Sequence, residues 1–506
     1  MSDEPEAALT MNDGPYPGGP GKPEDRSRPD GPARRARLSA RTGRPALTGS
    51  VLAGSVLAGS VAALIVAGLL GGALGFGAKA ACRAGAWNIG VEQFQAHCYT
   101  DIYPLYFAEG LSAGQVPYLQ HPVEYPVVMG AAMQAVAWVV RPIADPSVRG
   151  REFYDVTVAL LALFLVAGVL ATAYCAGRTR RWTALLVALS PALILDAFIN
   201  WDLIAMGLMM LALAAWAARR QWLAGVLLGL AVATKFYPVF CLGPLFLLCL
   251  RAGRMRAFWV TAGSAAAAWL AVNLPVALAA PRGWATFYTF NAGRGADWGA
   301  IWYFFETEHW PVVGGLSPHA LNAVSLGVLA VACAAIAALA LAAPRRPRLP
   351  QLIFLTVAAF VLTNKVWSPQ YVVWLVPLAV LARPRLIAYA LWQLAEIGYF
   401  YAIWGYLVTV VAGSQTAGAV STGPYFAALI ARFVTVLLLC ALVVRDILRP
   451  DRDVVRADGA DDPAGGVLSD APDRYLLRLG LRRPGMAIAR ARTAPAGYPG
   501  AFRAVG

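Results

Sequence analysis

Charged residues are scarce in this chain of 506 residues, because only 14% are Asp, Glu, Lys or Arg. Soluble proteins carry about 25% charged residues to cover their water-facing surface. Here 59% of the residues are hydrophobic, and the mean hydropathy is +0.58. These values exclude a soluble globular enzyme, a disordered scaffold and a nucleic-acid-binding protein. The charge is mostly positive, with 42 basic against 28 acidic residues. In membrane proteins such an excess marks cytoplasmic loops and contact with anionic lipid.

Cysteine is also rare, and its spacing excludes the common metal and redox motifs. The chain has seven cysteines and no Cys-x-x-Cys pair. Five of them lie in apolar runs and are interpreted as small core residues. Cys82 and Cys98 lie in a polar loop, where they could form a disulfide if that loop is extracytoplasmic.

The two ends of the chain differ from its middle. Residues 1–50 are rich in Pro, Gly, Asp and Arg and are predicted to be a disordered cytoplasmic tail. The apolar run at 51–78 is much longer than the 7–15 residues or so of a signal-peptide core, so we expect a retained spanning helix. Residues 447–506 form a second polar tail, also expected to be cytoplasmic. The domain between the tails, 51–446, is predicted to be all-α and polytopic.

Apolar runs repeat along this domain and predict 11 to 13 spans, although several are shorter than the roughly 20 residues a span needs. The run at 222–250 contains Lys235 and Pro238 and could be two half-length helices. Arginine clusters at 219–220, 251–256, 345–348 and 383–385 are expected on the cytoplasmic side. The loops at 79–124 and 281–318 then face outward. The side on which the arginines flanking 125–181 lie stays open.

Acidic residues concentrate in the first outward loop. Only 13 occur between Val51 and Arg445, and this loop contains four of them: Glu92, Asp101, Glu109 and Glu124. The tyrosines Tyr99, Tyr103 and Tyr125 lie among them. Such a loop is typical either of the roof of a pocket or of a solvated loop with interfacial tyrosines, and the residues alone favour neither.

A further carboxylate lies between two apolar runs, in Ile-Asn-Trp-Asp-Leu at 199–203. An acidic side chain at membrane depth is costly and therefore suggests a function. The alternative for Asp202 is an N-cap of the next helix.

Lysine is the scarcest of the charged residues, since only four of the 42 basic residues are lysines. Two of these, Lys235 and Lys365, interrupt apolar runs beside polar and aromatic neighbours. A compact ammonium at a helix end could bind a phosphate as a point charge. Snorkelling to the interface is the alternative, and the phosphate interpretation is favoured.

Four segments together resemble the GT-C superfamily of membrane glycosyltransferases, of the kind grouped as glycosyltransferase family 87. They are Tyr-Thr-Asp-Ile-Tyr-Pro-Leu-Tyr (99–106) with Val-Glu-Tyr-Pro (123–126), Asn-Trp-Asp-Leu (200–203), the run at 224–238 ending in Thr-Lys-Phe-Tyr-Pro, and Asn-Lys-Val-Trp-Ser-Pro-Gln-Tyr (364–371). The resemblance extends over about 51–445 and implies a GT-C-like helix bundle whose external loops form the active site.

The resemblance also implies a reaction. Such enzymes transfer a sugar, typically mannose, from a polyprenyl-phosphate donor to a lipid or glycan hydroxyl on the outer face of the cell membrane. By position, Asp101 is the expected catalytic base. No cofactor or metal is expected, and membrane lipids are the expected surroundings. The candidate phosphate ligands are Lys365, Lys235 and Arg294. The candidate substrate-binding residues are Tyr99, Tyr103, Glu124, Tyr125, Asp202, Gln370 and His309. The rival is a transporter or flippase, but it should show two related halves with charges near the midplane, and no such halves are found.

Overall fold

The computed structural model describes residues 46–457, 459 and 461–476, with side chains from Gly59 onward. The chain divides into two units, Met1–Ser55 and Val56–Gly506. Apart from the first turns of α1, all helices of the described residues belong to the second unit. The predicted tail at 1–50 lies almost entirely outside the described residues.

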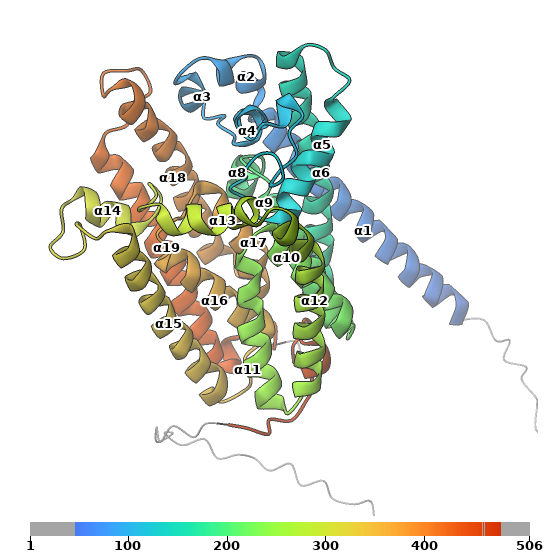
Figure 1. Ribbon diagram of the computed structural model, residues 1–506. Coiled ribbons are helices and arrows are strands. Elements are labelled where there is room, and N and C mark those ends of the chain that lie inside the picture. The colour runs from blue at the N-terminus through green and yellow to red at the C-terminus, as the bar shows by residue number, and fades with distance from the viewer. Residues whose placement is uncertain (1–45, 458, 460, 477–506) are drawn as a thin grey trace, which may run out of the picture. The chain divides into compact units, whose positions relative to one another are not determined.

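All regular elements of the described residues are helical (Figure 1). The α-helices are α1 (Ala46–Gly77), α2 (Ala80–Arg83), α3 (Glu92–Gln95), α4 (Ile102–Ala108), α5 (Val127–Val140), α6 (Pro146–Ala176), α7 (Leu185–Ala188), α8 (Pro191–Asp196), α9 (Asp202–Ala217), α10 (Gln221–Thr234), α11 (Leu242–Ala252), α12 (Met255–Ala279), α13 (Pro281–Gly293), α14 (Ile301–Thr307), α15 (Pro318–Ala342), α16 (Leu349–Thr363), α17 (Val372–Ala382), α18 (Leu386–Ala412) and α19 (Thr422–Leu448).

The apolar helices confirm the predicted all-α membrane protein. Six helices of the described residues are long and apolar enough to cross a membrane: Gly59–Gly77, Pro146–Ala176, Met255–Ala279, Pro318–Ala342, Leu386–Ala412 and Thr422–Leu448. Six more apolar helices of 10–17 residues accompany them. Helices of the shorter kind are poorly suited to lipid on their own, because a full span needs about 20 residues. They must therefore pack against the longer ones.

Two of the short helical segments are the halves of the run at 222–250. Helix α10 ends at Thr234, and the chain resumes as the 3₁₀ helix η4 (Tyr237–Cys241) followed by α11. Pro238 lies in the first turn of η4, where a missing N–H is tolerated. The same design recurs at 364–368, between α16 and the 3₁₀ helix η5 (Pro369–Tyr371) that leads into α17. Both breaks expose backbone polar groups and a lysine beside the same cavity.

Helix α10 packs closely on α12 because two glycines remove side chains from the contact. A Cβ at Gly225 would lie 2.2 Å from the carbonyl oxygen of Thr261, and one at Gly229 would lie 2.2 Å from that of Ala265. This Gly-x-x-x-Gly spacing brings two backbones together in the manner common between membrane helices. It fixes the position of the Lys235 break at the end of α10.

The structure also shows which arginines flanking 125–181 share an end of the bundle. Helix α5 has 14 residues, too few for a span, whereas α6 has 31. The Arg149 guanidinium donates to the carbonyl oxygens of Ile143 and Ser112 and so lies beside the 79–124 loop. At the other end of α6, the Arg180 guanidinium bonds to the carbonyl oxygen of Val454 in the C-terminal segment. The apolar run at 125–141 is therefore a short hairpin arm.

The first part of the polar C-terminal tail is folded against the bundle. We call residues 449–457, 459 and 461–476 the C-terminal strap, and the later part of the predicted tail, 477–506, lies outside the described residues. Its Asp453 accepts from the Arg348 Nε at 2.7 Å, and both side chains are buried. Its Asp473 pairs with the fully buried Arg251 at 2.6 Å. The strap thus neutralises arginines at the end of the bundle where α11 joins α12 and α15 joins α16.

Candidate active site

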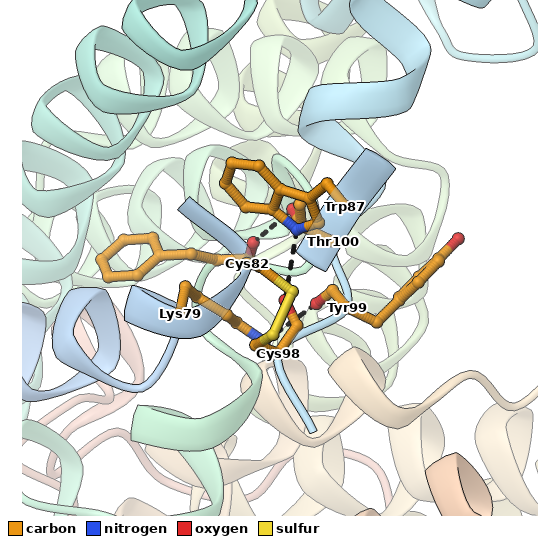
Figure 2. The surroundings of a disulfide bond; sticks show 7 residues. Lys79, Cys82, Trp87, Cys98, Tyr99 and Thr100 are labelled. Atoms are coloured by element: carbon orange, nitrogen blue, oxygen red, sulfur yellow. Dashed lines mark hydrogen bonds between the residues drawn. A yellow bond between two sulfur atoms is a disulfide. The ribbon is translucent and has the colours of Figure 1, made fainter. Parts of the chain in front are cut away.

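The residues just before Asp101 are bonded to other parts of the chain (Figure 2). Cys98 forms a disulfide with Cys82, whose Cα atom lies 5.7 Å away. The Lys79 ammonium donates to the carbonyl oxygen of Tyr99 at 2.9 Å. The Thr100 hydroxyl donates to the carbonyl oxygen of Phe198 at 2.7 Å. The pairing of Cys82 with Cys98, which the sequence left open, therefore fixes the chain just before Asp101.

Asp101 itself presents its carboxylate to a cavity. It occupies the N-cap position of α4, but its side chain makes no capping hydrogen bond. Its Oδ1 instead accepts from the Tyr99 hydroxyl at 2.6 Å, and its backbone N–H donates to the carbonyl oxygen of Ile199 at 2.7 Å. Burial raises the pKa of Asp101 to about 6, although the Tyr99 hydrogen bond works in the opposite direction. The result is a carboxylate suited to accept a proton near neutral pH.

The cavity has a volume of about 830 Å³ and is formed by segments from across the chain. Six loops or helix breaks reach it: the two halves of the first outward loop, the loop between α8 and α9, the break after α10, the loop after α13 and the break after α16. The predicted site residues that line it are Tyr99, Asp101, Glu124, Tyr125, Lys235, Arg294, Lys365 and Gln370. Most of the predicted site residues therefore line this one cavity.

Arg294 and Lys365 form one cationic part of the cavity wall. The Lys365 ammonium donates to the carbonyl oxygens of Ala292 and Arg294, and so holds the turn that follows α13. Burial, followed by the nearby guanidinium of Arg294, lowers the pKa of Lys365. The Arg294 guanidinium is one-third exposed and lies 3.5 Å from Asp297, at the edge of hydrogen-bonding distance. Arg294 therefore has donors left over for a ligand, whereas Lys365 is partly engaged.

Asp297 connects this wall to the break after α16. Its backbone N–H donates to the carbonyl oxygen of Lys365 at 2.8 Å, and its Oδ2 accepts from the Ser368 hydroxyl at 3.1 Å. Gly299 allows the close approach, because a Cβ there would lie 1.9 Å from the carbonyl oxygen of Trp367. These contacts join the loop after α13 to the break after α16.

Lys235 has a partner that the sequence did not reveal. Its ammonium lies 2.9 Å from Asp202 Oδ1, and Asp202 also accepts from the Trp374 indole at 3.1 Å. The rings of Tyr125, Tyr371 and Trp374 surround the ammonium at 5.4–5.9 Å. Asp202 is buried and begins α9 without capping it, so the N-cap alternative is wrong. Lys235 is also not a snorkelling lysine, because its charge is paired inside the protein.

Three predicted substrate-binding residues do not line the cavity. Asp202 lies beneath Lys235 and is separated from the cavity by it. Tyr103 is buried, stacks on Trp87 at 4.7 Å and donates to Asn88 at 2.9 Å, because its place on α4 turns it toward the disulfide-bonded loop. His309 is exposed at the end of α14, where its φ of 52° marks a sharp turn away from the helix. Tyr103 and His309 are therefore not among the residues that line the cavity.

Sequence reasoning found Tyr99 and Tyr125 but missed other aromatic residues of the cavity. Phe94, Tyr99 and Trp404 form a cluster with ring centroids 4.9–6.0 Å apart, and Tyr371 stacks on Trp374 at 3.7 Å. Aromatic faces of this kind suit the C–H surfaces of sugars. No sequence signal separates these rings from core or interfacial aromatics, because most of them lie inside apolar runs.

A second, apolar groove adjoins the cavity. It has a volume of about 450 Å³ and is formed by α5, α10, α12 and α13. It shares Tyr125, Phe236, Phe287 and Tyr288 with the polar cavity, so these four residues lie where the two spaces adjoin. Figure 1 shows α13 running crosswise near the ends of α12 and α15, and residues of α13 line both spaces.

The remaining acidic group, Glu124, lies between the cationic residues of the cavity. Burial raises its pKa, while Arg294 and then Lys235 oppose the shift. Among the described residues, no group of three or more His, Cys, Asp or Glu side chains could hold a metal ion.

Comparison with known proteins gives one match. The sequence model of glycosyltransferase family 87 fits residues 116–369, which is half of the chain. No curated protein matches significantly. The matched part includes Glu124, Lys235, Arg294 and Lys365, whereas Tyr99 and Asp101 precede it. A membrane glycosyltransferase is thereby favoured over a transporter, and the chain belongs to glycosyltransferase family 87.

Proposed function

We propose that this glycosyltransferase transfers a hexose, with mannose as the expected sugar, from a polyprenyl-phosphate donor to a lipid or glycan hydroxyl. The observation that carries the proposal is the meeting of two spaces: an apolar groove adjoins a polar cavity that contains both a raised-pKa carboxylate and a guanidinium. A lipid-linked sugar phosphate has a matching part for each: an apolar chain for the groove, a sugar beside the carboxylate and a phosphate for the guanidinium.

Asp101 is the proposed general base. The acceptor hydroxyl gives its proton to the Asp101 carboxylate as its oxygen forms a bond to C1 of the sugar. The bond from C1 to the phosphate oxygen breaks, and its electron pair leaves with the polyprenyl phosphate. The Tyr99 hydroxyl, 2.6 Å from Oδ1, holds the carboxylate in one orientation. The other carboxylate oxygen is then the proton acceptor.

Arg294 is the proposed primary partner of the phosphate. Negative charge grows on the leaving group in the transition state, so preorganised cations in a cavity lower the barrier. The Arg294 guanidinium combines partial exposure with a place in the cavity wall. The Lys365 ammonium donates to the carbonyl oxygen of Arg294 and so helps to hold Arg294 in place. It also adds a second positive charge. Lys235 contributes less, because its charge is offset by Asp202.

The apolar groove is the proposed site of the polyprenyl chain. Its lining is almost wholly hydrocarbon, and the side-chain amide of Asn273 is occupied by Trp284 at 3.0 Å. An isoprenoid chain buried there would gain roughly 25 cal/mol for each Å² removed from water. The groove ends at Tyr125 and Tyr288, where the headgroup would enter the polar cavity.

The reaction is proposed to take place on the outer face of the cell membrane. A disulfide next to Asp101 is typical of an oxidising compartment. The strap that binds Arg251 and Arg348 lies at the arginine-rich end, which favours a cytoplasmic place for both tails. The acceptor is consequently sought among the lipids and glycans of the outer leaflet.

The experiment is a transfer assay with purified protein and a membrane lipid extract. Radiolabelled polyprenyl-phosphate mannose and radiolabelled GDP-mannose are offered in parallel. We expect a labelled product only from the polyprenyl-phosphate sugar. Labelling from GDP-mannose alone would show that the donor is a nucleotide sugar and would refute the proposal.

A further inference from the structure

We propose that Lys79, Asp196, Glu396 and Arg432 form a buried charge cluster that fixes the spacing between the Asp101 loop and the turn at 364–371. The inference rests on the proposed function, because it gives these four side chains a positioning role between the proposed base and the phosphate-binding wall. None of them is predicted to touch the substrate.

Arg432 of α19 holds the turn. Its side chain is fully buried and its Nε lies 2.7 Å from Glu396 of α18. Its other two nitrogens donate to the carbonyl oxygens of Trp367 at 3.1 Å and Ser368 at 3.2 Å. The guanidinium is also sandwiched between the Trp367 and Tyr399 rings, at 4.2 and 4.3 Å. A planar fork is needed for this set of contacts, and lysine cannot reproduce it.

Lys79 holds the loop in a similar way. Its ammonium is fully buried and donates to the carbonyl oxygen of Tyr99, as Figure 2 shows. It lies 5.7 Å from the ring of Phe400, which belongs to α18, the same helix as Glu396. Each buried cation therefore bonds the backbone of one segment of the site.

Asp196 is the second buried carboxylate of the cluster. It is 2% exposed and interacts with Glu396, Lys79 and Arg432. Among the described residues, its Oδ1 has no hydrogen-bond partner. Its charge is thus compensated through space by Lys79 and Arg432, and the formal charges of the four side chains cancel.

Stability alone does not explain this arrangement. Taking charges out of water is costly, and a buried ion pair is often no better for stability than apolar residues of the same volume. The buried charges instead position the backbone of the site. Lys79 donates to a carbonyl oxygen near Asp101, and Arg432 donates to carbonyl oxygens near Lys365. A misplacement of about 1 Å between reacting groups can cost on the order of 100-fold in rate.

The test compares Arg432→Lys and Lys79→Met with the matched control Arg383→Lys. Arg383 also pairs with a residue of α19, Asp446, at 3.1 Å, and is nearly as buried, but its guanidinium bonds this carboxylate and not the backbone of either site segment. Turnover, donor KM and melting temperature in detergent are measured for each. We expect kcat to fall at least about 10-fold in the two cluster variants, with donor KM within about threefold of wild type. The control should lose activity only in proportion to any loss of stability.

Hydrogen exchange gives a readout that does not depend on activity. Lys79→Met removes the hydrogen bond to Tyr99, and Lys79 makes no hydrogen bond to 364–371. We nevertheless expect backbone amides at 364–371 to exchange faster as well, and Arg432→Lys to do the same at 98–102. Faster exchange in the mutated segment alone, or an equal response to Arg383→Lys, would overturn the inference. If the variants show this coupled exchange but the wild-type protein transfers no sugar, the proposed function is contradicted and the coupling is not.

Discussion

Asp101 differs from an ordinary surface aspartate in the pH at which it takes up a proton. Burial raises its pKa to about 6, from about 3.9 for a free side chain. A base must be ionised to accept a proton, so a raised pKa moves the loss of activity to higher pH. We expect kcat/KM for transfer to be level above about pH 7 and to fall tenfold per pH unit below about pH 6. Initial rates between pH 4.5 and 8 measure this, and a level profile down to pH 4.5 would argue against Asp101 as the base.

Arg294 is expected to account for more of the phosphate binding than either lysine. Arg294→Gln removes a cation that has donors to spare, and hydrogen bonds to charged groups contribute about 1.5–3 kcal/mol. Donor affinity should therefore weaken about 10- to 100-fold. Arg282→Gln is the control, because Arg282 is an exposed arginine at the start of α13. Equal donor binding by the Arg294 variant and the control would contradict this prediction, and Lys365 would become the main candidate for binding the phosphate.

Single side chains also show the limit of sequence reasoning. The carboxylates, lysines and tyrosines of the cavity were found because such residues are unusual in apolar surroundings. Tyr99 and Tyr103 are only four residues apart in the sequence, yet only Tyr99 reaches the cavity, because Tyr103 packs on Trp87. The pairing of Lys235 with Asp202 depends on how α9 and α10 pack, and no local pattern encodes it.

Helical elements were predicted best where a chemical break interrupts them. Lys235 and Pro238 mark the division between α10 and η4, and Pro369 marks the start of η5. Helix α5 was harder, because its apolar run has the composition of a span but only 14 residues of helix. The hairpin became evident only when Arg149 was found beside Ser112.

The disulfide is expected to support the loop that carries Asp101. Replacing Cys82 and Cys98 by serine removes a cross-link that closes a loop of 16 residues, which contributes about 3 kcal/mol in the chain-entropy estimate. We expect a lower melting temperature together with slower transfer, because Cys98 is three residues from the proposed base. Cys333→Ser, at a free cysteine of α15, is the control. An unchanged melting curve for the double variant would show that the cross-link is dispensable.

The complete chain combines a bundle, a cavity at one end of its helices and a strap on arginines at the other. The strap was predicted only as a polar tail, because alternating Arg and Asp residues resemble a solvated segment until their partners are known. Arg348 is bonded by Asp453 and by the carbonyl oxygens of Leu381 and Ala382, so the strap connects α16 to α17.

Breaking this connection should destabilise the protein without touching the cavity. Asp453→Asn leaves the Arg348 guanidinium buried without its counter-charge, and such changes cost about 3–5 kcal/mol. Arg345→Met is the matched control, because the Arg345 side chain is 47% exposed and its pair with Asp461 should contribute less than about 1 kcal/mol. Thermal melting in detergent compares the two. Similar melting temperatures would mean that the strap is not part of the stable fold.

The central claim is that Asp101 accepts the proton in sugar transfer from a lipid phosphate. The most direct measurement is made on Asp101→Asn, with donor binding and transfer recorded on the same preparation. The amide has nearly the same shape but cannot take up the proton. We predict donor affinity within about threefold of wild type and transfer slowed by at least about 100-fold. Transfer at the wild-type rate by this variant would contradict the account.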